Sequence, residues 1–183
     1  AHTPEALLKS LQILRKHQND NISLVFGCGG DRDFKKRPLM AKIASENCKK
    51  IFVTDDNPRS EKPEKIRDEI LSNIKNKNCF NISSRTVAIK TAIKNADPNE
   101  IILVAGKGHE IEQIYKNRII KISDKKIITN LKIKKTSNKN KNFEQNKKIF
   151  KEKLNNKFLE KFHGLAIDSR VVKKDNLFLT IRG

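Results

Sequence analysis

Apolar residues recur at helical spacing near the start of the chain and then gather in short continuous runs. Leu7, Leu11 and Leu14 lie on one face of a helix, which predicts an amphipathic helix from about residue 4 to residue 17. Apolar runs closed by polar residues predict buried strands at 23–26, 51–54 and 101–104, and a weaker strand at 79–82. Helical spacing between these runs predicts further helices that begin near Pro38, after an N-cap at Ser60, and near Ser84.

This alternation of buried strands and amphipathic helices is typical of an α/β fold. Strands that are apolar along their whole length belong to a parallel sheet that is covered on both faces. We therefore predict a Rossmann-like domain over residues 1–131, with a parallel sheet covered by helices. Polar loops follow three of the strands, and open α/β sheets bind their ligands at the carboxyl ends of the strands.

The composition changes sharply after residue 131. Residues 132–161 hold eleven Lys and three Glu, together with many Asn and Gln, and are too polar to bury a core. We interpret them as a lysine-rich tether with a late helix, although a helix that binds RNA or a membrane surface is the sharper alternative. Beyond the tether, apolar runs at 165–167 and 177–179 predict two strands of a partial small α/β unit over residues 162–183.

The strong positive charge raises the question of an anionic partner. The formal net charge is +19, and charged residues make up 33% of the chain. Aromatic residues, at 5%, are not interleaved with the lysines in the way that base stacking needs. We therefore expect no nucleic-acid partner, and we interpret most of the lysines as residues of solvated faces.

The three cysteines (Cys28, Cys48 and Cys79) lie far apart and do not have the spacing of metal ligands. Free thiols are typical of a reducing compartment, so we expect a cytoplasmic protein. The chain shows neither a basic-then-apolar leader nor an apolar run long enough to span a bilayer. It opens without Met and ends directly after a strand-like run, so we expect a piece of a longer protein.

Three polar loops offer side chains for the recognition of a charged ligand. The first, from Gly27 to Arg37, has glycines that permit close approach of a ligand, but by itself it equally fits a glycine-rich turn. The second, from Asp55 to Arg59, presents Asn and Arg on a backbone that Pro58 makes rigid, which suits a carboxylate. The third, from Gly106 to Glu110, offers a carboxylate to an ammonium group, whereas its histidine is more typical of a structural residue. An amino acid with several carboxylates and an ammonium group needs this combination of charges.

Five motifs occur in the order and spacing found in one family of cell-wall enzymes. They are Ala1-His2-Thr3-Pro4, Phe26 to Asp33, Lys36 to Met40, Thr54 to Arg59 and Ala105 to Glu110. With them, residues 1–131 closely resemble the carboxy-terminal domain of Mur ligases, in particular of those that add 2,6-diaminopimelate to a peptidoglycan precursor. In that family the Asp-Asn-Pro-Arg sequence marks the enzymes that use meso-diaminopimelate instead of lysine.

The resemblance implies a binding site for meso-diaminopimelate. The residues that match the contacts of the family are Arg32, Asp56, Asn57, Pro58, Arg59, Gly106 and Glu110. Asn57 and Arg59 would hold the distal carboxylate, and Glu110 would hold the distal ammonium group. A site built around polar partners rejects an analogue that lacks them, by about four to five orders of magnitude in favourable cases. One departure is Phe34-Lys35, where relatives often carry Lys-Gly.

The family reaction is an ATP-dependent ligation. ATP phosphorylates a carboxylate of UDP-MurNAc-L-Ala-D-Glu, and the amine of the incoming amino acid then attacks the acyl phosphate. The phosphate-binding loop, the Mg²⁺ ligands and a modified lysine belong to a central domain, and no Gly-x-x-x-x-Gly-Lys-Ser/Thr occurs in this chain. The resemblance therefore implies no catalytic or metal-binding residue here, no ligase activity of the chain alone, and a nucleotide edge formed by His2 and Arg37.

A second, shorter resemblance lies at the end of the chain. Asp168-Ser169-Arg170 and the residues from Asp175 to Gly183 resemble the start of the amino-terminal, UDP-substrate-binding domain of a Mur ligase. This resemblance implies that Ser169 contacts the UDP end of the substrate. It also implies that the chain joins two ligases, of which the second adds D-alanyl-D-alanine. An accidental Asp-Ser-Arg turn is the alternative.

A non-catalytic module that binds amino acids or nucleotides is the competing interpretation of the chain. A phosphate-binding loop upstream of Ala1 would favour the enzyme over this module. A basic protein that binds RNA or membranes would instead show salt-sensitive retention on anionic matrices through residues 132–161.

Overall fold

The computed structural model describes residues 2–18, 21–97, 100–131, 166–167 and 177–180. Most of the described strands belong to one mixed sheet with the order β3-β2-β1-β4-β8-β7. Its strands are β1 (Ile22–Phe26), β2 (Lys50–Val53), β3 (Cys79–Asn81), β4 (Ile101–Val104), β7 (Ala166–Ile167) and β8 (Leu177–Thr180). The strands from β3 to β8 pair in parallel, and only β7 at the edge runs antiparallel to its neighbour. The predicted parallel sheet is therefore confirmed.

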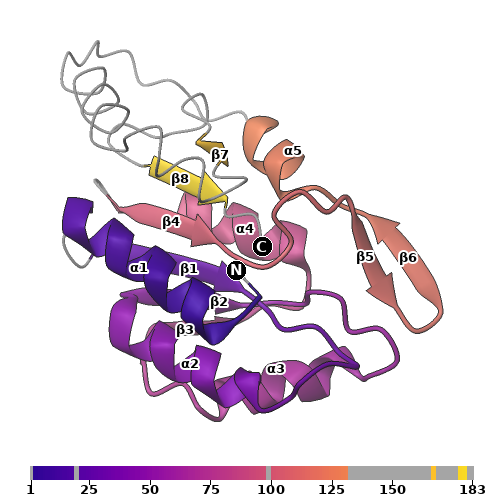
Figure 1. Ribbon diagram of the computed structural model, residues 1–183. Coiled ribbons are helices and arrows are strands. Elements are labelled where there is room, and N and C mark those ends of the chain that lie inside the picture. The colour runs from indigo at the N-terminus through magenta and orange to yellow at the C-terminus, as the bar shows by residue number, and fades with distance from the viewer. Residues whose placement is uncertain (1, 19–20, 98–99, 132–165, 168–176, 181–183) are drawn as a thin grey trace.

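Helices cover both faces of this sheet (Figure 1). One face packs against α1 (Pro4–Gln18), α2 (Lys36–Asn47) and α3 (Pro63–Leu71), and the other against α4 (Arg85–Lys94) and α5 (Asp124–Thr129). Successive residues of a strand point to opposite faces, so each central strand contributes to both cores. In β1, for example, Leu24 and Phe26 face the first core and Val25 faces the second.

The order of the strands explains this distribution of helices. The chain moves from β1 through β2 to β3 in one direction, and then returns to place β4 on the other side of β1. Crossovers between parallel strands are right-handed, so reversing the direction puts the next helix on the opposite face of the sheet. The reversal falls between β1 and β4, and the loops that follow these two strands flank the position where such sheets bind ligands.

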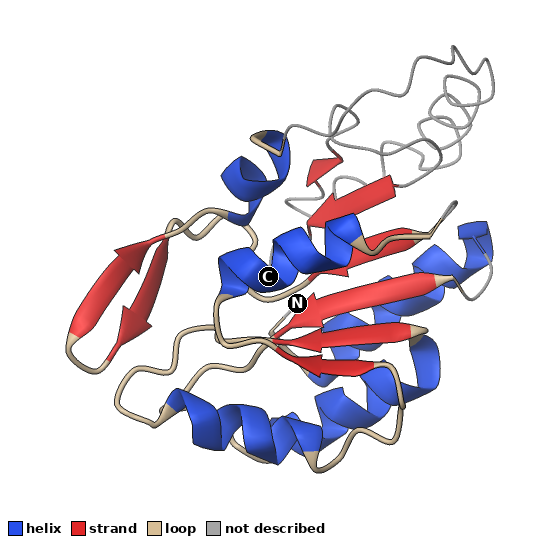
Figure 2. Ribbon diagram, turned by 180° about the vertical axis from the view of Figure 1, so that it is seen from behind, coloured by secondary structure: helices blue, strands red, loops and turns tan. Residues whose placement is uncertain are grey.

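A β-hairpin projects beyond the carboxyl ends of the strands (Figures 1 and 2). It consists of β5 (Glu112–Tyr115) and β6 (Arg118–Lys121), which pair antiparallel with each other. The apolar pattern of the sequence predicts neither this hairpin nor α5. Both are short, and β6 is exposed along its whole length, so neither has the apolar pattern from which the other elements were predicted.

The predicted helices and strands of residues 4–104 are all present, but two helix starts differ. The helix predicted near Pro38 begins two residues earlier, at Lys36. The prediction of Ser60 as an N-cap was wrong: α3 begins at Pro63, and Lys62 is its N-cap residue. The Ser60 hydroxyl and backbone N–H bind the carboxylate of Asp31 instead, so this serine joins two loops.

The strands expected near the end of the chain are both present as β7 and β8. β8 pairs in parallel with β4, so it extends the sheet of the first domain. The range 132–161 and most of 162–183 lie outside the described residues, so the tether and the separate second unit stay predictions. No helix of the described part of the chain is long and apolar enough to cross a membrane.

We predict that the sheet core carries the stability of the fold. Leu24→Ala removes a fully buried side chain from the central strand, and should lower the free energy of unfolding by about 2–5 kcal/mol because it leaves a cavity. Leu39→Ala is the matched control, since Leu39 is 53% exposed on α2 and should change that free energy by less than about 0.5 kcal/mol. Denaturant unfolding of both variants measures this, and equal losses would contradict the assignment of the core.

Candidate functional site

Backbone and side-chain contacts join the loops after β1 and β2. The Gly30 N–H donates to the Asn57 carbonyl over 2.9 Å, and the Asp31 N–H donates to Oε1 of Glu61 over 2.7 Å. A Cβ atom added to Gly30 would lie 1.9 Å from the Pro58 carbonyl oxygen, so no other residue fits there without moving this loop. The glycines of the first loop thus permit two backbones to approach closely, rather than forming an isolated turn.

Arg59 presents its guanidinium group from a backbone conformation that is rare for a bulky residue. Its φ is 52°, in the left-handed region, and such outliers cluster at functional sites because the surrounding structure must hold them. Its N–H donates to the Ile114 carbonyl over 3.0 Å, which ties the second loop to the hairpin. Nη1 donates to the carbonyls of Gly30 and Asn57, whereas Nε and Nη2 have no hydrogen bond among the described residues. That free edge, formed by Nε and Nη2, can bind a carboxylate with two parallel hydrogen bonds.

The side-chain amide of Asn57 connects the second loop, the third loop and the hairpin. Its Oδ1 accepts from Nζ of Lys107 over 2.6 Å and from the Ile114 N–H over 3.0 Å. Its Nδ2 donates to Oε2 of Glu110 over 2.9 Å. An amide nitrogen carries two N–H groups, so one remains for a ligand.

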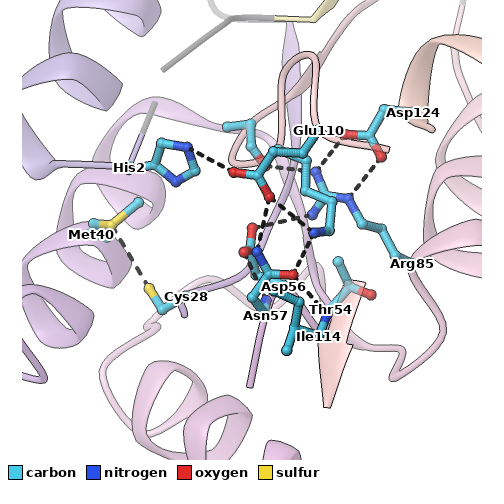
Figure 3. Close-up of polar contacts among 12 residues, drawn as sticks. His2, Cys28, Met40, Thr54, Asp56, Asn57, Arg85, Glu110, Ile114 and Asp124 are labelled. Carbon is cyan, nitrogen blue, oxygen red and sulfur yellow. Dashed lines mark hydrogen bonds and ion pairs between the residues drawn. The ribbon is translucent and has the colours of Figure 1, made fainter. Parts of the chain in front are cut away.

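Glu110 faces Asn57 on one side and His2 on the other (Figure 3). Oε1 of Glu110 lies 3.8 Å from Nε2 of His2, and only about a third of the Glu110 side chain is exposed. Burial alone would raise the pKa of this carboxyl group, but the hydrogen bond from Asn57 and the charge of Lys107 outweigh it and lower the pKa. Glu110 is therefore an anion whose Oε1 can receive an ammonium group. Burial lowers the pKa of His2, which favours the neutral imidazole.

A buried ion pair supports the third loop from behind. Arg85, at the start of α4, donates from Nε and Nη2 to the two oxygens of Asp124 over 2.8 and 2.7 Å, and from Nη2 to the Ala105 carbonyl. Nη1 of Arg85 and Oδ2 of Asp56 are both buried without a hydrogen bond, 4.0 Å apart. Gly106 lies beside them with a φ of 115°, and a Cβ atom on it would come within 2.5 Å of that Asp56 oxygen. Glycine at this position thus keeps a polar gap open under the loop.

A second buried pair fixes the start of the second loop. Asp55 binds Nη1 of Arg67 on α3 and accepts a hydrogen bond of 3.0 Å from the hydroxyl of Tyr115 on β5. Burial raises the pKa of Tyr115, and the adjacent Asp55 carboxylate adds to the effect, so the phenol stays a donor. This contact holds the hairpin against the loop that carries Asn57 and Arg59.

The structure brings most of the sequence-predicted site residues together. Asp56, Asn57, Pro58, Arg59, Gly106, Glu110 and His2 lie in or directly beside the contacts described above. Arg32 is exposed on the first loop. A Cβ atom added to Gly29 would lie 4.0 Å from Cγ of Arg32 and 2.9 Å from Nη1 of Arg59. The two arginines therefore flank Gly29. Ser169 lies outside the described residues.

Arg37 occupies a different environment from the other predicted site residues. Its side chain is 1% exposed, and it donates to Glu69, Glu61 and the Gly29 carbonyl over 2.6, 2.8 and 3.4 Å. These contacts join α2, α3 and the first two loops, so its observed role is structural. Contact of Arg37 with a nucleotide stays a prediction.

Lys107, Arg85 and Asp124 are the residues of this site that the sequence analysis did not assign to it. Lys107 stands inside the third loop, but no pattern indicates that its side chain points inward. Arg85 and Asp124 are 39 positions apart, so only the packing of α4 against α5 brings them together. Among the described residues, no group of three His, Cys, Asp or Glu side chains is arranged to hold a metal ion.

We predict that the Arg85–Asp124 pair is required for the stability of the site. Asp124→Ala leaves the Arg85 guanidinium buried and unpaired, which should cost about 3–5 kcal/mol of unfolding free energy. Glu46→Ala is the control, because the exposed Lys42–Glu46 pair contributes about 0.5 kcal/mol or less. Chemical denaturation compares the two variants. If Asp124→Ala lost no more unfolding free energy than Glu46→Ala, the buried pair would not contribute to stability.

Comparison with known proteins identifies the family. Residues 1–108 match the family model described as "Mur ligase, glutamate ligase domain". Over 132 residues the chain is 50% identical to the UDP-N-acetylmuramoyl-L-alanyl-D-glutamate–2,6-diaminopimelate ligase of Buchnera aphidicola, covering 72% of this chain and 27% of that protein. The ligase of the same name from Prochlorococcus marinus is 46% identical over 141 residues, which cover 76% of this chain and 27% of the relative.

A solved structure of a ligase with that name is also similar. Its TM-score is 0.65 at 38% sequence identity, and the match covers 69% of this chain and 26% of the solved one. The chain therefore spans about a quarter of the length of the relatives that it matches. The family model covers more than half of the chain. The chain belongs to the Mur ligase family.

Proposed function

We propose that this chain supplies the amino-acid-selecting site of an ATP-dependent peptidoglycan-precursor ligase, one that adds meso-diaminopimelate to UDP-MurNAc-L-Ala-D-Glu. Relatives that are named as 2,6-diaminopimelate ligases and are 46–50% identical to this chain support this proposal. The distal end of meso-diaminopimelate carries a carboxylate and an ammonium group, whereas the distal end of lysine carries only the ammonium group.

The observation that carries the proposal is the hydrogen bond between Asn57 and Glu110. It fixes a donor and an acceptor side by side, with one amide N–H and the Glu110 Oε1 left for a ligand. The free edge of the Arg59 guanidinium lies on the same loop as Asn57. A zwitterionic group complements this set, because its carboxylate binds the two donors and its ammonium binds the carboxylate. Lysine would leave the half-buried Arg59 without a carboxylate partner, so it would lose the charged hydrogen bonds that meso-diaminopimelate makes there.

The remaining parts of the reaction belong to this proposal as well. ATP and Mg²⁺ would be held mainly by a central ligase domain outside these residues, since they contain no phosphate-binding motif. His2, which lies beside Glu110, and Arg37 are our candidates for the edge of the nucleotide site. The precursor and ATP are both soluble metabolites, so a cytoplasmic location fits the reaction. The chain alone should form no product.

The proposal extends to the end of the chain on sequence grounds. Residues 162–183 would begin a second Mur ligase, one that adds D-alanyl-D-alanine, and Ser169 would contact its UDP-linked substrate. Residues 132–161 would tether the two enzymes. The support for this part is the resemblance around Asp168-Ser169-Arg170.

We predict that the chain prefers meso-diaminopimelate to lysine, and that Arg59 is needed for this preference. Arg59→Ala should weaken meso-diaminopimelate binding by about a hundredfold or more, because the variant removes a charged partner of the distal carboxylate. Its effect on lysine should be small. Calorimetric titration of both ligands measures this. Arg15→Ala, on α1 and hydrogen-bonded to Asn47, is the control and should retain the preference. Equal affinity of the unaltered chain for both amino acids would refute the specificity.

A second prediction concerns the pH dependence of this binding. The pKa of Glu110 is lowered in the folded chain, so its carboxylate stays charged as the pH falls through the usual glutamate range. Affinity for the ammonium group should therefore persist through that range and be lost only below it. Titrations at several pH values test this, with Glu110→Gln as the reference without a charge. The prediction would be contradicted if the unaltered chain lost affinity within the usual pH range of glutamate titration while Glu110→Gln did not.

A further inference from the structure

Lys107 places a fully buried ammonium group between the second and third loops. It stands between two glycines with positive φ, Gly106 and Gly108, and its side chain is 0% exposed. Nζ donates to Oδ1 of Asn57 over 2.6 Å, to the Glu112 carbonyl over 2.6 Å and to Oε2 of Glu110 over 3.3 Å. An ammonium group has three donors and no acceptor, so every N–H of Lys107 is used.

Stability alone does not explain a charge at this depth. Burial lowers the pKa of Lys107, while the charges of Asp56 and Glu110 act in the opposite direction. Taking an ammonium group out of water is costly, and a protein with an apolar side chain in its place is often no less stable. Because all three donors of this buried lysine bind neighbouring groups, we expect it to orient those groups.

That arrangement is the orientation of the Asn57 amide. Two donors, Lys107 and the Ile114 N–H, converge on one end of the amide, so this end must be the carbonyl oxygen. The nitrogen end then faces the Glu110 carboxylate and keeps one N–H free. Lys107 also contacts that carboxylate, so one cation orients the donor and favours the ionised acceptor.

We propose that Lys107 is a positioning residue: its buried ammonium group fixes the Asn57 amide and the Glu110 carboxylate for an amino acid with a distal carboxylate and ammonium group. The chemistry of this ligand rests on the proposed function, whereas the positioning itself is a property of the unliganded chain. Lys107 does not have to touch the ligand, since all its donors are used within the protein.

The test compares the unaltered chain with Lys107→Met, which has a similar length but neither charge nor donors. Carbon NMR should show the Glu110 carboxyl titrating at a higher pH in the variant, because the nearby cation and its hydrogen bond are gone. The side-chain amide signals of Asn57 should shift, since its oxygen loses one of two donors. Affinity for meso-diaminopimelate should fall about tenfold to a hundredfold, and the preference over lysine should narrow.

Lys50→Met is the matched control for a general loss of stability. The Lys50 side chain is 16% exposed and binds two carboxylates, Asp97 and Glu100, at the amino ends of the strands, opposite the site. This variant should lose stability as well, but it should leave the Glu110 titration, the Asn57 signals and the ligand preference unchanged. Equal effects of the two variants on these readouts would overturn the proposal.

A measurement on the unaltered chain covers the case in which Lys107→Met does not fold. A scalar coupling across the hydrogen bond should connect Nζ of Lys107 with the side-chain carbonyl carbon of Asn57, and its ammonium protons should exchange slowly. Fast exchange without this coupling would refute the positioning role. If Glu110 and Asn57 respond to Lys107→Met while neither amino acid binds, the positioning stands and the proposed function fails. If Lys107→Met keeps the preference for meso-diaminopimelate and leaves the Glu110 titration and the Asn57 signals unchanged, the positioning role fails and the proposed function stands.

Discussion

The side-chain amide of Asn57 joins three separate parts of this chain, and the geometry of the site depends on it. An amide group has an acceptor at one end and donors at the other, so each neighbour must have the complementary character. Lys107 and the hairpin backbone donate to its oxygen, and Glu110 accepts from its nitrogen. A residue of similar size without this polarity could satisfy only one side. The Asn57 side chain is therefore one contact that the loop after β2, the loop after β4 and the hairpin all share, beside the bonds of Arg59 and Asp55 to the hairpin.

Around this amide the protein keeps its buried charges paired. Arg85 binds Asp124 with two hydrogen bonds, Arg67 binds Asp55, and Arg37 binds Glu61 and Glu69. Each pair links a helix to a loop or to another helix, so the loops at the carboxyl edge are fixed to the helices on the two faces. Between Asp56 Oδ2 and Arg85 Nη1, however, two buried polar atoms lie 4.0 Å apart and have no hydrogen bond. This gap lies beside Gly106, at the base of the loop that carries Glu110.

Backbone strain and close approach complete the arrangement. Arg59 holds a left-handed conformation because its N–H and its guanidinium group are both bound, to the hairpin and to the first loop. Gly30 lets the first loop pass against Pro58. These contacts, together with the Asn57–Glu110 hydrogen bond, hold the side chains of Arg59, Asn57 and Glu110 in place without a ligand. Preorganisation matters for selectivity, because a site that need not rearrange cannot adapt to an analogue that lacks a partner.

The sequence by itself determined the sheet, the helices that cover it and the three loops at its edge. Burial of strands and amphipathic helices leaves a periodic pattern of apolar residues, and loops that follow parallel strands must meet at one edge. The resemblance to Mur ligases then indicated which loop residues matter. Only the tertiary structure decided that Lys107 points inward, that Arg85 meets Asp124, that Arg37 is buried in ion pairs and that the exposed hairpin closes one side of the site. These contacts join residues far apart in the chain, and their polar side chains follow no period that a sequence can show.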